Sequence, residues 1–184
     1  MLSAGIGVLA SIPLLGRVLF PGLAARVRRG TGQLLGRPHG TRLALERTEP
    51  DPGPECGRVG FTIEEMTGIA ERVLRDVGLT AGFARVVLTI GHGSHSMNNP
   101  HESAHDCGAC GGSVGGPNGR AIAQILNDPR VRAGLAARGL AIPDATVFVG
   151  GLHNTCNEYV KFFDTDRVPA SHRAEFEAAE DAIE

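Results

Sequence analysis

The side chains best suited to chemistry are concentrated in one loop, between Gly91 and Gly112. Four of the chain's seven histidines and two of its four cysteines fall within nineteen residues (His92, His95, His101, His105, Cys107, Cys110). A surface loop gains no packing from such a mixture, and imidazole with thiolate selects zinc rather than the hard cations. The sequence therefore predicts a zinc site here, and three interpretations compete for it.

The first interpretation is a His-Glu-x-x-His motif formed by His101, Glu102 and His105. In zinc proteases a helix places both histidines on one face and the glutamate serves as the base. Here Gly108 would end such a helix after about two turns, and no apolar stripe would anchor it. We favour solvated histidines in a short turn and keep an HExxH-type zinc hydrolase as an alternative.

The second interpretation is a redox or structural pair, Cys107 and Cys110. A redox pair of this spacing opens a helix, whose N-terminus lowers the thiol pKa, whereas a glycine-rich stretch follows here. A zinc knuckle needs a second such pair, and the sequence has none. Cys56 and Cys156 have no partner motif, so we expect both to be structural or incidental.

The third interpretation takes His92, at the end of a strand, together with Cys107 on the loop. A strand end is rigid, so a ligand there is well positioned. This pair is our prediction for the metal ligands. Asp106 and His153 are candidates for groups beside the metal site, although a hydrogen bond that orders its own loop is the favoured role of His153.

The elements that position this loop follow an α/β pattern. Thr62 and Glu65 form a capping box before a helix that ends at Gly78. A continuous apolar strand is predicted over Ala84–Ile90, and such a strand suits a parallel sheet. The remaining predictions are helices over 119–127 (with Asn118 as N-cap), 129–139 and 169–183, and strands over 146–149 and 159–163. The His- and Cys-rich loop follows the first strand, and a second polar loop, which carries His153 and Cys156, follows the strand over 146–149. Both loops therefore lie at strand ends, where open α/β sheets bind ligands.

Length and composition limit the classes of protein that fit. A chain of 184 residues can bury one substantial core. With 4% aromatic residues and no tryptophan, the composition argues against a base-stacking nucleic-acid surface. We predict an apolar and basic helical segment over 1–47, a linker over 48–60 and an α/β half-domain over 61–184. Pro13 and Arg17 cut the first apolar run below bilayer-spanning length, so a core helix is favoured over contact with a membrane surface.

Several longer motifs resemble one family. They are Gly91-His92-Gly-Ser, Asn98-Asn99-Pro100, Asp106-Cys107-Gly-Ala-Cys110-Gly-Gly, Gly116-Pro117-Asn118 and Phe148-Val-Gly-Gly-Leu-His153-Asn-Thr. Together they resemble the DabA family, β-carbonic-anhydrase-like subunits of an energy-coupled inorganic carbon transporter. The resemblance runs through most of residues 60–184 and more weakly through the apolar start.

By this resemblance, His92 and Cys107 match the family's second pair of zinc ligands. The first pair, in a Cys-x-Asp segment with a nearby arginine, has no match here, because Cys56 is followed by Gly-Arg-Val. The family's proteins are several times longer than this chain. We therefore expect a truncated fragment with an incomplete β-carbonic-anhydrase-like fold, which is inactive by itself.

The resemblance also implies a cofactor, a reaction and partners. The cofactor is Zn²⁺, and the reaction is the hydration of CO2 to bicarbonate. The partner is a DabB-type membrane subunit related to proton and cation antiporters, which places the protein peripherally on the cytoplasmic side of the inner membrane. The alternative from another class is a zinc-stabilised interaction module without catalytic activity.

Overall fold

The computed structural model describes residues 42–55, 57–94 and 106–183, together with residues 11, 15, 18–20 and 23. All elements named below belong to one compact unit, residues 43–94 and 103–184. Most of the predicted apolar and basic segment over 1–47, and the whole motif at 101–105, lie outside the described residues. In the part of the chain that is described, no helix has the length and apolarity needed to cross a membrane.

The first helix of this unit, α3 (Ile63–Asp76), begins as its sequence predicts. The Thr62 hydroxyl accepts from the Glu65 N–H at 3.2 Å, and a Glu65 carboxylate oxygen accepts from the Thr62 N–H at 2.7 Å. These reciprocal bonds satisfy N–H groups that have no partner within the helix. The residues that α3 buries recur at helical spacing (Met66, Thr67, Ala70, Leu74). The capping box is therefore confirmed.

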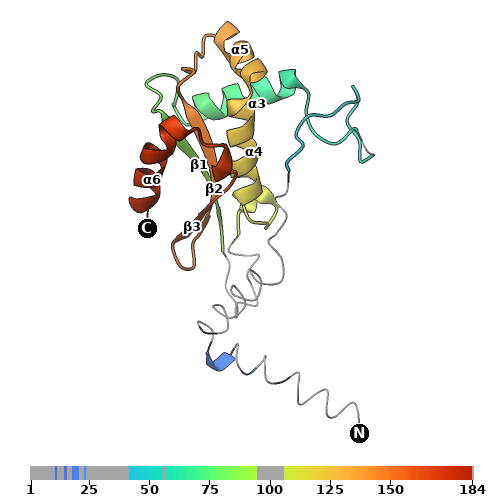
Figure 1. The fold of residues 1–184 in the computed structure, drawn as a ribbon. Coiled ribbons are helices and arrows are strands. Elements are labelled where there is room, and N and C mark those ends of the chain that lie inside the picture. Colours follow the sequence, from blue (N-terminus) through green and yellow to red (C-terminus); the bar gives the residue numbers. More distant parts are fainter. Residues whose placement is uncertain are drawn as a thin grey trace. The chain divides into compact units, whose positions relative to one another are not determined.

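The described residues form a three-stranded sheet, and His92 lies in its first strand. Its strands are β1 (Val86–Gly93), β2 (Val147–Asn154) and β3 (Tyr159–Phe162), in the order β1-β2-β3. β1 and β2 pair in parallel along their whole length, which confirms the α/β logic of the sequence. β3 returns antiparallel to the end of β2, so the sheet is mixed and not purely parallel (Figure 1).

Both parallel strands are longer than predicted. The sequence indicated that the first would stop at Gly91 and the second at Gly150. In the structure β1 continues to Gly93 and β2 to Asn154, and these two residues pair with each other. A Cβ on Gly91 would lie 2.0 Å from the Gly115 carbonyl oxygen, and one on Gly150 would lie 2.5 Å from a Cα of the covering helix. These glycines permit close approach of another backbone and do not mark strand ends.

Helices cover both faces of the sheet (Figure 1). α4 (Gly116–Asn127) lies on one face and α6 (Arg173–Asp181) on the other, whereas α5 (Pro129–Ala137) packs against α3 and α4. Phe148 of β2 packs into a core with α3, α4 and α5, whereas its neighbour Val149 packs with Phe176 of α6. Successive strand residues point to opposite faces, so two cores form on one sheet.

Two predicted helix starts were wrong. α4 begins at Gly116 with Gly115 as its N-cap, so Asn118 lies inside the first turn and does not cap it. Pro117 suits that turn because its missing N–H would have no helical partner there. The last helix was predicted from Pro169, but a 3₁₀ turn (Ala170–His172) precedes α6.

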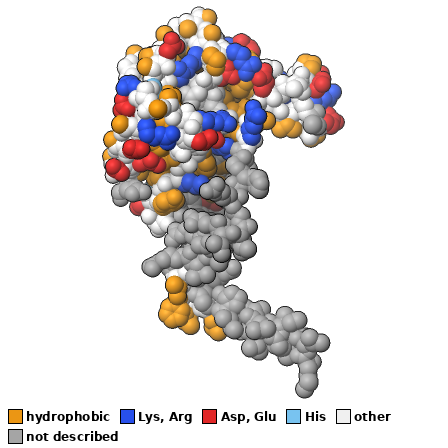
Figure 2. Space-filling view, viewed as in Figure 1, with side chains coloured by type: hydrophobic (Ala, Val, Ile, Leu, Met, Phe, Trp, Pro, Cys, Tyr) orange, Lys and Arg blue, Asp and Glu red, His pale blue; other side chains and the backbone are white. Residues whose placement is uncertain are grey.

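Acidic and basic side chains interleave on the face shown in Figure 2. Arg138, just after α5, pairs with Glu71 of α3 at 2.8 Å and also with Glu64. Arg85, just before β1, donates to the Ser171 carbonyl at 2.8 Å and pairs with Glu175 of α6. These pairs connect elements that are far apart in the sequence.

The capping box gives a prediction on acid stability. The pKa of Glu65 is lowered from 4.5 to about 2. The main cause is the Arg47 guanidinium that bonds to its carboxylate, and the second is the hydrogen bond from the Thr62 N–H. Because the folded pKa is the lower one, the stabilisation is present above pH 4.5 and is lost as the pH falls toward 2. We expect Glu65→Gln to reduce the loss of Tm over this range, measured by circular dichroism. Glu177→Gln, on the exposed face of α6, is the control and should leave the slope unchanged.

Candidate metal centre

The C-terminal end of β1 is held by two backbone contacts with the loop that follows. The Gly115 N–H donates to the His92 carbonyl at 2.7 Å. The Ser94 N–H donates to an Asp106 carboxylate oxygen at 2.6 Å. Asp106 was predicted to lie beside the metal site. In the structure its carboxylate accepts from the Ser94 N–H, and this bond ties the returning loop to the end of β1.

Cys107 is fixed by its own backbone. Its N–H donates to the Ser113 carbonyl at 3.2 Å, and its carbonyl accepts from Cys110 at 2.9 Å and from Gly112 at 3.2 Å. The short 3₁₀ turn Gly108–Cys110 closes this arrangement. Only 9% of the Cys107 surface is exposed, so its side chain is held inside the protein rather than in solvent.

Cys110 lies against the same site. Its sulfur accepts from the Asn118 side-chain amide at 3.2 Å. The pKa of Cys110 is raised, first by a hydrogen bond with the Cys107 side chain and then by burial, while Asn118 acts in the opposite direction. Sequence reasoning missed Asn118 as a site residue. The signal for it was Pro117, which marks the helix start and so places Asn118 in the turn beside the loop.

His92 and Cys107 line one cavity of about 550 Å³, although they are fifteen positions apart in the sequence. Cys110 and Asn118 also line it. Most of the remaining wall is apolar and comes from α3, β1 and α4 (Val73, Val77, Leu79, Val87, Ile90, Ile122). The fold therefore places one imidazole and one thiol at the edge of an apolar space, where polar interactions are stronger than in water.

The described residues do not contain a complete metal site. Among residues 42–55, 57–94 and 106–183, no three side chains of His, Cys, Asp or Glu are close enough together to bind a metal ion. A tetrahedral zinc site takes four ligands, or three with water. His92 and Cys107 fit zinc in chemical type, and further donors would have to come from outside the described residues. His95, His101, Glu102, His105 and Cys56 lie outside them as well.

His153 is the register partner of His92 on the neighbouring strand. Its Nε2 forms a hydrogen bond of 2.7 Å with a carboxylate oxygen of Glu158, across the turn between β2 and β3. Glu158 has a φ of 57°, a left-handed conformation that is uncommon for glutamate. Cys156, in the same turn, lies 3.1 Å from the Ser94 hydroxyl. His153 thus has a partner that orders its turn.

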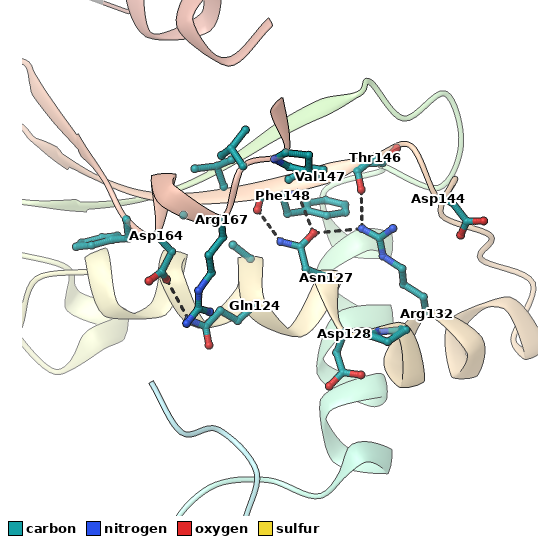
Figure 3. Close-up of a pocket in the computed structure, with 17 residues that line it drawn as sticks. Gln124, Asn127, Asp128, Arg132, Asp144, Thr146, Val147, Phe148, Asp164 and Arg167 are labelled. Carbon is teal, nitrogen blue, oxygen red and sulfur yellow. Dashed lines mark hydrogen bonds between the residues drawn. The ribbon is translucent and has the colours of Figure 1, made fainter. Parts of the chain in front are cut away.

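A second cavity, of about 470 Å³, lies between α4, the start of β2 and residues 163–169 (Figure 3). Its labelled polar groups bond largely to one another. The Asn127 amide pairs with both the N–H and the carbonyl of Phe148, at 3.0 and 2.7 Å. Arg132 donates to the Thr146 carbonyl at 2.7 Å, and Gln124 donates to Asp164 at 3.0 Å. These bonds indicate that the polar groups of this cavity are structural. In particular, the Asn127 side chain takes the place of a further strand beside Phe148 at this edge of β2.

This arrangement predicts a stability effect. Asn127→Ala leaves the backbone of Phe148, a buried residue, without its two side-chain partners. We expect a loss of about 1–3 kcal/mol in the free energy of unfolding, measured by urea titration. Gln124→Ala is the control: it removes one contact with a carboxylate that Arg120 also binds, so a smaller loss is expected. Equal losses in both variants would contradict the role assigned to Asn127.

Known proteins resemble this chain over its whole length. The chain is 45% identical over 179 residues to the "Probable inorganic carbon transporter subunit DabA 2" of Rhodopirellula baltica. It is 46% identical over 186 residues to the "Probable inorganic carbon transporter subunit DabA 1" of Sorangium cellulosum. These alignments cover 97% and 100% of this chain. The chain spans only 17% and 18% of the relatives' own length, as expected for a family of much longer proteins.

A third relative extends the comparison to another genus. The "Probable inorganic carbon transporter subunit DabA" of Dechloromonas aromatica is 48% identical over 176 residues, which cover 95% of this chain and 17% of that protein. No solved structure matches the chain. The family model described as "Probable inorganic carbon transporter subunit DabA" matches residues 1–184 in full. The chain therefore belongs to the DabA family.

Proposed function

We propose that this chain supplies part of a zinc site that hydrates CO2 to bicarbonate in an inorganic carbon uptake system. The observation that carries the proposal is the shared cavity of His92 and Cys107. A thiol and an imidazole, both on ordered backbone and at the edge of one apolar space, suit zinc better than any hard cation. The family description supplies the link to inorganic carbon.

The chain's own residues would hold the metal and shape the space beside it. His92 would bind through a ring nitrogen and Cys107 through its sulfur, with the remaining ligands supplied from outside the described residues. Zinc supplies the Lewis acidity that makes water a nucleophile near neutral pH. The apolar wall of Val73, Val87 and Ile122 suits a small neutral molecule such as CO2, which needs no hydrogen-bond partner to enter.

The proposal includes a partner and a place in the cell. The relatives are described as transporter subunits, and a subunit acts with other subunits. We propose a DabB-type membrane subunit related to cation antiporters as that partner, and a peripheral position on the cytoplasmic side of the inner membrane. Coupling to ion flow through the partner would drive hydration in one direction.

Growth complementation tests this function. A full-length family member containing this segment, expressed with its membrane subunit, should restore growth in air to a strain that requires high CO2. The same protein without the membrane subunit, or with His92→Ala or Cys107→Ala, should not. If both alanine variants restore growth while remaining bound to the membrane subunit, the proposed hydration site is wrong. If they instead lose the membrane subunit, a zinc-stabilised interaction module becomes the better account.

A further inference from the structure

The two edges of β1 differ in their hydrogen bonding. At one end of the strand the Val147 N–H donates to the Arg85 carbonyl at 2.7 Å, and at the other end the Thr155 N–H donates to the Gly93 carbonyl at 2.8 Å. Both acceptors are odd-numbered, and in a parallel ladder the backbone groups of successive residues alternate between the two edges of the strand. The odd-numbered residues from 85 to 93 therefore face β2, and the even-numbered ones face outward.

The outward backbone groups of Leu88 and Ile90 have no hydrogen-bond partner in the part of the chain that the structure describes. β1 is the first strand in the order β1-β2-β3, so no described strand lies beside this edge. The contrast with β2 is clear, because β3 pairs with the end of its outer edge and the Asn127 side chain bonds to the N–H and carbonyl of Phe148. Unpaired groups of this kind are a template for a further strand.

The sequence of β1 does nothing to protect this edge. Residues 86–93 read Val-Val-Leu-Thr-Ile-Gly-His-Gly, without proline and without Lys, Arg, Asp or Glu. Proline and charged side chains are the usual means of blocking an edge strand. Ile90 is 41% exposed, whereas Phe148 and Val149 of β2 are each 3% exposed. β1 thus has the composition of an interior strand in the position of an edge strand.

A groove runs along the same edge. The cavity of about 550 Å³ is lined by six consecutive residues of β1, from Val87 to His92. Side chains alternate between the faces of a sheet, so a cavity on one face would be lined mainly by every second residue. This cavity therefore follows the edge. Val73 and Val77 of α3 form another wall, and Val77 is 68% exposed.

We propose that this groove binds an apolar β-strand from the remainder of a full-length family member, which makes β1 an interior strand of the complete protein. The strand is apolar on both faces, because Val87 packs with the core beside α3 and Leu88 packs with the core beside α6. Its backbone pairs with Leu88 and Ile90, and its side chains cover Ile90 and Val77.

The length of the relatives favours this occupant. The chain spans 17% of the Rhodopirellula baltica protein, so most of such a protein lies outside the matched segment. A strand on the same polypeptide reaches the edge at an effective concentration that a separate molecule does not have. The strand would also close the open side of the cavity that His92 and Cys107 share. The inference does not require a metal there, so it goes beyond the proposed function and does not depend on it.

Hydrogen exchange in a full-length family member, read at single residues by mass spectrometry, tests the pairing. The N–H groups of Thr89 and Gly91 face β2 and serve as the internal reference. After correction for intrinsic rates, we expect the N–H groups matching Leu88 and Ile90 to exchange within about tenfold of this reference, because all four would belong to one cooperative sheet. Faster exchange than this at both positions would show that the edge is open and would overturn the inference.

Photo-crosslinking identifies the occupant. The photoreactive residue p-benzoylphenylalanine takes the place of Ile90 in the full-length protein, and exchange at Leu88 in this variant checks that the edge is still paired. We expect capture of an apolar segment of the same polypeptide, outside the stretch that matches this chain. The same photoreactive residue in place of Glu177, on the exposed face of α6, is the control and should not capture that segment.

The other crosslinking results would each overturn the assigned occupant. Capture of a second copy, recognised by mixing isotope-labelled and unlabelled protein, would make the edge a dimer interface. Capture of a different subunit, or of a residue within the 184 positions, would assign the groove to that segment instead. Neither experiment measures metal or activity, so failure of the inference leaves the proposed function standing.

Discussion

Zinc is expected to be lost from a full-length family member when the residue matching His92 or Cys107 is changed to alanine. In the proposed site each residue would supply one donor to a shell of about four, and the binding free energy of a structural or catalytic zinc depends on a complete shell. Both side chains line the same cavity, and only 9% of the Cys107 surface is exposed. Metal analysis of the purified variants measures the result.

His101→Ala is the matched control for this experiment. It removes a histidine from the same loop, in the His-Glu-x-x-His motif, and we expect the zinc content to stay unchanged. Zinc loss in His101→Ala, with zinc retained in Cys107→Ala, would contradict the assignment. The protease-like interpretation of His101, Glu102 and His105 would then be favoured.

The second large effect concerns the packing of α4 on the sheet. A Cβ on Gly91 would lie 2.0 Å from the Gly115 carbonyl oxygen, and one on Gly119 would lie 2.6 Å from the Thr89 carbonyl oxygen. Backbone atoms cannot rotate away as a side chain can, so α4 must move. We expect Gly91→Ala and Gly119→Ala each to lower the free energy of unfolding by about 3 kcal/mol or more, at the upper end for overpacking. Urea titration followed by circular dichroism measures this.

Gly108→Ala is the control for the glycine variants. A Cβ at Gly108 meets no atom within 4 Å, and no positive φ is involved, so stability should be unchanged. Movement of α4 would also disturb the bond of 2.7 Å between the Gly115 N–H and the His92 carbonyl. Gly91→Ala should therefore reduce metal affinity as well as stability. An unchanged unfolding free energy in Gly91→Ala would show that α4 does not pack on the strand in this way.

The sequence alone was sufficient where the governing interactions are local. The capping box of Thr62 and Glu65 depends on residues three apart, and the structure shows both of its hydrogen bonds. The apolar runs before Gly91 and Gly150 predicted two neighbouring parallel strands, because a strand covered on both faces needs apolar residues on both. The density of His and Cys in one loop identified the candidate site, and the longer motifs identified the family.

Tertiary structure decided what depends on contacts between distant residues. Gly91 and Gly150 looked like strand ends, because glycine weakens a strand in isolation, yet α4 approaches so closely that a Cβ would not fit. Asn118 looked like a helix cap, and only the return of the loop to α4 brings its amide to Cys110. The sequence by itself thus determined which residues could bind a metal. The fold decided that His92 and Cys107 share one cavity wall, because strand pairing and helix packing set distances that residue spacing cannot.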